Sequence, residues 1–164
     1  MAYSGKFTPK NPKKYIGDPK NIVYRSRWEL QCFRWCDNQS TVKRWASEEI
    51  VVPYQYSVDE FVHRYYPDLY IEYTNGKKVL VEIKPDKETR PPEKPKRQTQ
   101  RYVTESMTYI KNQDKWEAAQ AFCKVKGWKF EVWTEKTLEK MGLLPKKMTK
   151  LKPLGPMKKP KKGA

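Results

Sequence analysis

The hydrophobic positions of the chain first follow a helical period over residues 24–37. Four apolar side chains there have i, i+4, i+7, i+8 spacing: Trp28, Cys32, Trp35 and Cys36. Such spacing places them on one face of an amphipathic helix. Ser26 precedes the pattern and Glu29 lies three residues later, which predicts an N-cap and a capping box.

The C-terminal half contains a longer helical segment and a short one. A helix is expected within residues 102–126, most clearly over 112–126, and Gly127 predicts its end. Its inward face carries Trp116, Ala119, Phe122 and Cys123. Thr134 is expected to cap a short helix that ends near Gly142.

Strand patterns lie between these helices, as short apolar runs or as alternation of apolar and polar residues. They cover residues 48–56, 65–73, 77–84 and 128–133. Pro53 indicates an edge strand or a bulge, and Asn75-Gly76 predicts a hairpin. The order is helix, three strands, helix, strand, short helix, without internal repeats. It predicts an α/β fold with a mixed β-sheet core flanked by helices.

Basic charge is concentrated at the two ends of this 164-residue chain, whose formal net charge is +16. Residues 1–20 account for +4 and residues 146–164 for +8, which leaves +4 for residues 21–145. Both ends are rich in Pro and Gly, so we expect a basic N-terminal arm, one folded domain and a Lys/Pro-rich tail. Such arms favour nucleic acid, whose phosphates they neutralise without reading sequence, over mere solubility or another acidic partner.

Cysteine and apolar content exclude several classes of protein. Cys32, Cys36 and Cys123 form no CxxC pair and His63 is the only histidine, which argues against a zinc site. We expect reduced core thiols in a cytosolic protein that is not secreted. Neither a signal peptide nor a membrane-spanning apolar run is present, and we expect no nucleotide cofactor.

The predicted hairpin allows two registers. A two-residue turn pairs residues whose numbers add to 151 and places Asp68 opposite Ile83. A three-residue loop over 74–76, with Gly76 left-handed, gives a sum of 150 and places Asp68 opposite Glu82. We prefer the second register, because one face then becomes almost wholly apolar. That face carries Leu69, Ile71, Val79, Val81 and Ile83.

The preferred register sets two carboxylates side by side, with Lys84 two residues along the same face. Adjacent like charges repel, and a divalent cation would compensate them. Asp68, Glu82 and the backbone carbonyl of Ile83 would offer the oxygen ligands that Mg²⁺ prefers, and Mn²⁺ should substitute. Lys84 would polarise water or stabilise charge on phosphorus. The alternative is a solubility pair on an edge strand, but Glu82 ends an apolar run in which an unpaired carboxylate is costly.

The motif Pro67-Asp68, followed on the next strand by Glu82-Ile83-Lys84, resembles the PD-(D/E)XK nuclease superfamily. The resemblance covers residues 20–140 and implies a restriction-endonuclease-like fold. The strings YRSRWE, WASEEIVVPY, HRYYPD and VLVEIKP are similar to head completion nucleases of tailed phages. The string WEAAQAFCKVKGWKFEVWTE also resembles transposon end-cleaving endonucleases. These resemblances imply a Mg²⁺-dependent endodeoxyribonuclease in which Asp68 and Glu82 bind metal and Lys84 is the catalytic lysine.

The resemblance also implies auxiliary polar residues. Glu29 on the preceding helix would assist through a second metal or a water, or would serve only the helix cap. Another acid is expected at Glu48 or Glu49, and we prefer Glu48. Gln98 or Gln100 would lie on the far side of the site.

Basic side chains that flank the motif are expected to contact phosphates, with solvated surface charge as the alternative for each. They are Arg25, Arg27, His63, Arg64, Lys96, Arg97 and Arg101. The loop over residues 87–101 is the better candidate, because it leaves the strand that carries Lys84.

Three functions follow as hypotheses. The first is an endonuclease that processes packaged double-stranded DNA ends during phage head completion. It would act in the host cytoplasm or the virion head, beside capsid or portal proteins. The second is a junction-resolving or transposon-end endonuclease on the same fold, acting on branched DNA or ends. The third is a structural DNA-binding virion protein without activity.

Deletion of residues 146–164 is expected to weaken binding of DNA and to flatten its dependence on salt, because eight lysines are removed. Cleavage of DNA that is already bound should continue. The measurement is a titration of duplex DNA at several salt concentrations with both chains. An unchanged salt slope would contradict a role of the tail in binding phosphates.

Overall fold

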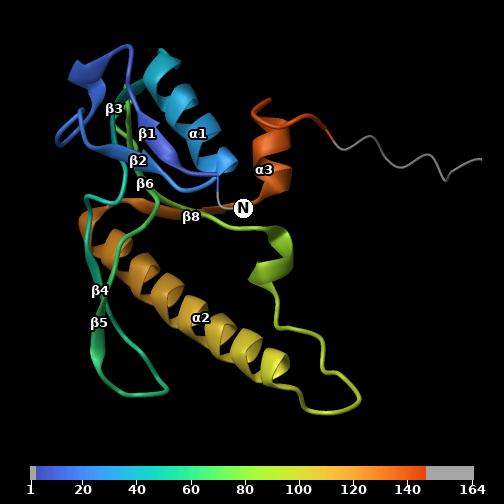
Figure 1. Ribbon diagram of the computed structural model, residues 1–164. Helices are drawn as coiled ribbons and strands as arrows, with labels where there is room; N and C mark the ends of the chain where they lie inside the picture. Colours follow the sequence, from blue (N-terminus) through green and yellow to red (C-terminus); the bar gives the residue numbers. More distant parts are fainter. Residues whose placement is uncertain (1–2, 147–164) are drawn as a thin grey trace, which may run out of the picture.

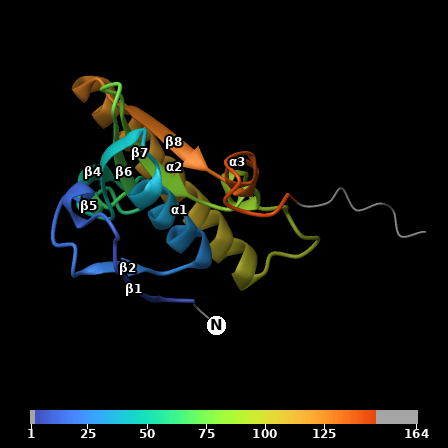
Figure 2. The same cartoon turned by 90° about the horizontal axis from the view of Figure 1, so that it is seen from above.

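A four-stranded mixed sheet lies at the centre of residues 3–146, the part of the chain that the computed structural model describes (Figure 1). In spatial order its strands are β3 (Val42–Ala46), β6 (Leu69–Tyr73), β7 (Lys78–Ile83) and β8 (Lys129–Trp133). Only the β7–β8 pair is parallel. Helices α1 (Arg27–Asn38) and α2 (Gln100–Lys126) lie on opposite sides of the sheet (Figures 1 and 2). The predicted fold class is therefore confirmed.

The hairpin β6–β7 has the preferred register. Tyr70 pairs with Leu80, so the numbers of paired residues add to 150. The loop over residues 74–76 closes with the Gly76 N–H donating to the carbonyl of Tyr73 at 3.0 Å. Gly76 has a φ of +87°, a conformation that favours glycine. Both faces of the hairpin are buried, because a helix covers each side.

Strand β3 was not predicted. It is an edge strand of the main sheet, and its Trp45 is fully buried opposite Ile71 of β6. The register shifts between Val42 and Arg44. Such an irregularity breaks the alternation of inward and outward residues, which is the signal by which a strand is recognised in a sequence.

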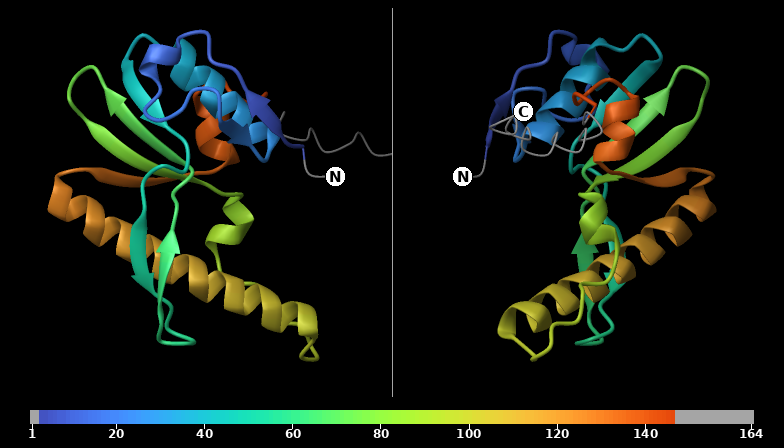
Figure 3. Two further views of the ribbon diagram at one scale, coloured as in Figure 1. Left: turned by 60° about the vertical axis from the view of Figure 1, so that its left-hand side comes forward. Right: turned by 90° about the vertical axis from the view of Figure 1, so that its right-hand side faces the viewer.

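The predicted strands over 48–56 and 65–73 are wrong in extent, and the first of them does not join the main sheet. Strand β4 (Val52–Gln55) pairs with β5 (Val62–Tyr65) in a separate two-stranded ribbon. The ribbon projects from the main sheet and packs against α2 (Figure 3). Buried Pro67 separates β5 from β6, because proline has no N–H to donate to a ladder. Pro53 does lie on an edge strand, as expected.

Helix α1 begins as predicted, but its buried face only partly matches the predicted one. The Ser26 hydroxyl accepts from the Glu29 N–H at 3.1 Å, which confirms the N-cap. The Glu29 carboxylate accepts from the Arg25 N–H at 2.7 Å, so the predicted reciprocal bond to Ser26 is not the one formed. The buried residues are Leu30, Cys32, Phe33, Cys36 and Asp37. The two tryptophans of the predicted face, Trp28 and Trp35, are only partly buried, whereas Phe33 packs against Phe7 of the N-terminal segment.

The N-terminal segment is part of the fold, so the prediction of a flexible arm is wrong for residues 3–20. Strand β1 (Gly5–Phe7) pairs with β2 (Ile22–Tyr24), and the short 3₁₀ helix η1 (Pro12–Lys14) lies between them. Phe7 and Tyr15 join the core. The lysines dominate the composition of this segment, so its two anchoring aromatic residues were not recognised as core residues in the sequence. The predicted tail, apart from Lys146, lies outside the described residues.

The buried carboxylate of Asp37 fastens this segment to α1. Its two oxygens accept from the backbone N–H groups of Lys10 at 2.8 Å and Asn11 at 2.9 Å. The side chains of Asn11 and Lys14 donate to the Asp37 carbonyl. Hydrogen bonds to a charged acceptor are stronger than neutral ones, so this contact contributes substantially to the docking of the segment.

The remaining helices have the end residue and the N-cap that the sequence predicted. Helix α2 is longer than its clearest pattern and ends at Gly127, whose φ is +73°. Helix α3 (Glu135–Lys140) follows the N-cap Thr134. Cysteines 32, 36 and 123 are free and buried, and burial raises the pKa of the Cys123 thiol to about 11. Within residues 3–146, no helix combines the length and apolar character that crossing a bilayer requires.

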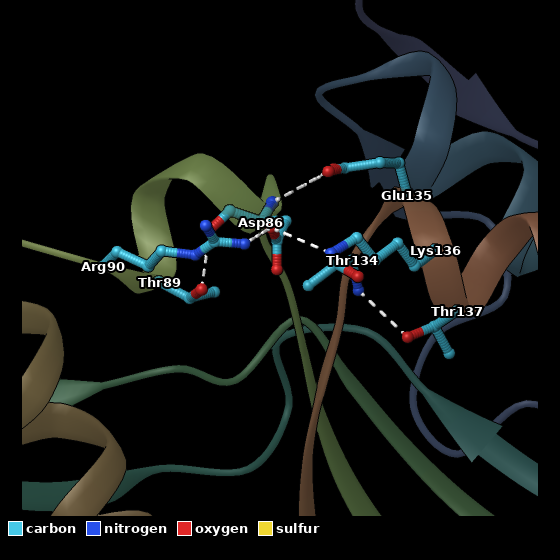
Figure 4. A network of polar contacts seen from close by, with 7 residues as sticks. All are labelled: Asp86, Thr89, Arg90, Thr134, Glu135, Lys136 and Thr137. Carbon is cyan, nitrogen blue, oxygen red and sulfur yellow. Dashed lines mark hydrogen bonds and ion pairs between the residues drawn. The ribbon is translucent and has the colours of Figure 1, made fainter. Parts of the chain in front are cut away.

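The basic loop after β7 is attached to α3 at its start (Figure 4). The 3₁₀ helix η2 (Asp86–Thr89) follows β7, and the Asp86 N–H donates to the Glu135 carboxylate at 3.0 Å. The Asp86 carboxylate forms ion pairs with Arg90 and with Lys136. These contacts determine the direction in which the chain continues after β7 and Lys84.

Replacement Asp37→Asn is expected to lower the free energy of unfolding by about 2 kcal/mol, because an amide group would face a backbone donor and the charged acceptor is lost. Asp18→Asn is the matched control, since Asp18 accepts from Lys20 N–H at 2.9 Å on the exposed surface. Its effect should stay within about 0.5 kcal/mol. Urea unfolding measures both, and equal effects would contradict the role assigned to Asp37.

Candidate active site

A cavity of about 490 Å³ opens where the hairpin β6–β7 meets the start of α1, the strand β5 and the helix α2. Its lining is almost entirely polar or aromatic. The lining residues are Arg25, Glu48, Arg64, Tyr65, Tyr66, Asp68, Glu82 and Lys115. The cavity therefore gathers side chains from segments that are far apart in the sequence.

Two carboxylates from neighbouring strands meet in this cavity. Asp68 directly precedes β6, and its Oδ2 accepts from the Ile83 N–H at 2.7 Å. Glu82 lies on β7, and its Oε2 accepts from the Tyr65 hydroxyl at 2.5 Å. The hairpin register, extended by one residue, places Asp68 opposite Glu82. The structure thus brings together the two acids that the register argument aligned.

The electrostatics of the pair are unfavourable in the free protein. Burial raises the pKa of Asp68 well above its usual range, and the charge of Glu82 raises it further. The Ile83 N–H and Lys84 only oppose this shift. Glu72, at the other end of the hairpin, has a lowered pKa because Arg44 hydrogen bonds to it at 3.1 Å. The negative charge is therefore compensated at the Glu72 end of the hairpin, and only incompletely at the end that carries Asp68 and Glu82.

Lys84 contacts the pair from beside the cavity. Its Nζ lies 3.6 Å from Glu82 Oε1, and its side chain is about one quarter exposed. It is not among the residues that line the cavity. The ammonium partly neutralises Glu82 and leaves Asp68 without an ion-pair partner in the described part of the chain.

The donor set suits a small divalent cation. Residue Ile83 donates its N–H toward Asp68, and in a strand the carbonyl of the same residue points to the same side. Two carboxylates and one carbonyl are hard oxygen ligands of the kind Mg²⁺ accepts, with water completing the shell. No group of three or more His, Cys, Asp or Glu side chains within residues 3–146 is arranged to hold a metal. The residues present fit a cation that keeps several waters.

Of the auxiliary acids, Glu48 lines the cavity and the other two do not. Glu48 has a φ of +54°, and its Oε1 lies 2.5 Å from Arg25 Nη1. Glu29 contacts the backbone of Arg25, and burial followed by the charges of Glu48 and Glu82 raises its pKa. Glu49 accepts from the Tyr15 hydroxyl at 3.3 Å instead. The structure therefore places Glu48, rather than Glu49, at the site.

The predicted basic residues divide into two groups. Arg25 and Arg64 line the cavity. The others lie outside it: Arg27, His63, Lys96, Arg97 and Arg101. Of these, His63 pairs with Asp59 and Arg101 pairs with Glu105. Residues Gln98 and Gln100 are exposed outside the cavity as well.

Sequence reasoning missed Tyr65, Tyr66 and Lys115. Lys115 lies on α2 between buried Asn112 and Trp116, so a charged residue within an otherwise inward stripe was the available signal. The tyrosines directly precede Pro67, and only the path of β5 shows that they reach the site.

Comparison with known proteins identifies the family to which the chain belongs. A family model described as TnsA-like endonuclease N terminal matches residues 39–135, which include Asp68, Glu82, Lys84 and Lys115. The head completion nuclease of Enterobacteria phage T4 is 43% identical over 146 residues, which cover 87% of this chain and 97% of that protein.

Replacement Asp68→Asn is expected to raise the free energy of unfolding of the metal-free protein by about 1 kcal/mol, because it removes one of two adjacent like charges. Glu72→Gln should lower that free energy, since it removes the partner of Arg44. Urea unfolding at pH 8 in EDTA measures both. Destabilisation by both replacements would show that the Asp68 charge is already compensated.

Proposed function

Because the chain belongs to the TnsA-like endonuclease family, we propose that Asp68, Glu82 and Lys84 form the active site of a Mg²⁺-dependent DNA endonuclease. Family membership makes the chain a nuclease, whose substrate is DNA. The observation that carries the assignment of the site is the pair of incompletely compensated carboxylates in a polar cavity, with an ammonium 3.6 Å from one of them.

The side chains would divide the work according to their contacts. Asp68, Glu82 and the Ile83 carbonyl would hold Mg²⁺, or Mn²⁺ in its place, and the cation would supply a Lewis acid for the phosphate. The Tyr65 hydroxyl fixes the orientation of Glu82 through its 2.5 Å hydrogen bond. Lys84 would stabilise negative charge that develops on the phosphoryl oxygens.

Glu48 and Arg25 form the rim of the proposed site. Their ion pair joins the start of α1 to the chain after β3, and both side chains line the cavity. The place of Glu48 in the lining of the cavity supports an auxiliary role for it, and release of Arg25 toward a phosphate would free the Glu48 carboxylate to face the site. Glu29 accepts a hydrogen bond from the backbone N–H of Arg25, and it would then act by positioning Arg25.

The biological setting follows from the relative that the chain resembles along most of its length. The name head completion nuclease, for a protein 43% identical to this chain, supports a nuclease role in phage head completion, and we propose that the step is the processing of packaged DNA ends. Such a role would place the protein in the host cytoplasm during assembly or in the virion head, in contact with capsid or portal proteins. Duplex ends or branched duplexes would be the DNA forms encountered there.

Cleavage of transposon ends or junctions is the second candidate, favoured by the TnsA-like match over residues 39–135. The two functions make different demands on the substrate. Junction cleavage requires branched DNA, whereas processing of packaged ends requires only linear duplex. A purely structural DNA-binding role has weaker support, because the family is one of endonucleases.

Replacements Glu82→Ala and Lys84→Ala are each expected to reduce the rate of plasmid nicking at least about a hundredfold, because the first removes a proposed metal ligand and the second removes the ammonium that would stabilise the developing charge. EDTA should abolish nicking, and Mg²⁺ or Mn²⁺ should restore it. Lys78→Ala is the matched control, since Lys78 lies on the same strand opposite Glu72. Equal nicking by the wild-type protein and both variants would falsify the catalytic assignment.

A further inference from the structure

The cavity contains a lysine that the proposed mechanism does not use. Lys115 comes from the middle of α2, and it lines the cavity together with Asp68 and Glu82. Lys84 contacts Glu82 but does not line the cavity. Lys115 therefore presents a second ammonium group to a ligand in the cavity, in addition to that of Lys84 beside it.

Two tyrosine rings hold Lys115 in place. Its Nζ lies 5.4 Å from the centroid of the Tyr65 ring and 5.9 Å from that of Tyr54. A cation within about 6 Å of an aromatic face is attracted by the ring electrons. The Tyr65 hydroxyl in turn donates to Glu82. The same tyrosine therefore positions one metal-binding candidate and one ammonium group.

The donors of Lys115 lack a matching acceptor within residues 3–146. Arg25 is paired with Glu48 and Lys84 with Glu82, whereas Lys115 forms no ion pair or hydrogen bond there. An ammonium group carries three donors. Burial lowers the pKa of Lys115, and the charge of Glu82 acts in the opposite direction. A half-buried cation beside two carboxylates, yet without direct contact to them, suits an anionic oxygen of a ligand.

We propose that Lys115 is a substrate-binding residue that donates to a phosphate oxygen of the DNA strand in the cavity, at the cleaved phosphate or its neighbour. The proposal rests on the proposed function, because it takes the cavity to be the place where DNA binds. It adds a phosphate contact on α2, a helix that carries none of the motif residues. Arg64 is exposed on β5 and also lines the cavity. It would contact the DNA strand at a phosphate farther from the carboxylates.

The alternative is that Lys115 only packs on the tyrosines, and Lys111 provides a matched control for it. Lys111 lies one helical turn earlier on α2, with its Nζ 4.9 Å from the centroid of the Tyr56 ring. It does not line the cavity. Lys115→Met and Lys111→Met each remove one charge and keep an unbranched apolar stem, so the pair separates loss of a phosphate contact from loss of charge or packing.

The test measures binding of a fluorescent duplex to the full chain in EDTA at several salt concentrations. Lys115→Met should weaken binding about tenfold at low salt, as expected for loss of a charge-assisted hydrogen bond. It should also reduce the slope of log affinity against log salt by about 0.9, the value for one phosphate contact. Lys111→Met should change neither quantity, and Lys115→Arg, which keeps the charge, should restore the slope.

Two results would overturn the proposal: equal losses in Lys115→Met and Lys111→Met, or a loss of affinity in Lys115→Met with an unchanged salt slope. Thermal unfolding of each variant shows that the chain remains folded. Failure of the proposed function is seen separately, because the wild-type protein would then not cleave DNA in Mg²⁺. The binding measurement in EDTA does not depend on cleavage.

Discussion

The register of the β6–β7 hairpin is the constraint on which the rest of the structure depends. A shift of one residue would turn every side chain of one strand to the other face of the sheet. The three-residue loop with Gly76 at positive φ excludes that shift and leaves Asp68 opposite Glu82. The same register gathers Leu69, Ile71, Val79 and Val81 on one face, where all four are buried.

Buried carboxylates at the two ends of this hairpin differ in how far their charge is compensated. At one end Glu72 pairs with Arg44 and Lys43, an arrangement that stabilises the fold. At the other end Asp68 and Glu82 repel each other, and within residues 3–146 Lys84 is the single ion-pair partner of Glu82. Proteins depart from such local rules mainly at functional sites. The contrast within one hairpin is the reason why we propose a functional site at one end and a structural ion pair at the other.

Local patterns predicted the parts of the fold that local physics determines. Ser26, Gly127 and Thr134 end or begin helices by their own hydrogen bonds or backbone angles. Strand β3 was not predicted because a bulge or irregularity interrupts its alternation of inward and outward residues. Strand β1 was not predicted because lysines lie on both sides of its anchoring Phe7 in the sequence. The charge of Lys115 within the inward stripe of α2 was a local signal, but the cavity that its side chain lines depends on where α2 crosses the sheet. Composition describes such a residue only as one more positive charge.

The rim of the cavity shows how long-range packing completes a site that local sequence only begins. Glu48 has a φ of +54°, which costs energy for a residue with a side chain. Its ion pair with Arg25 is largely exposed, and exposed pairs contribute too little to account for such a conformation. The chain must nevertheless turn there, because β3 ends at Ala46 in the main sheet and β4 begins at Val52 in the ribbon. The turn that separates the two sheets also opens the cavity between them, so the strained residue lies at its edge.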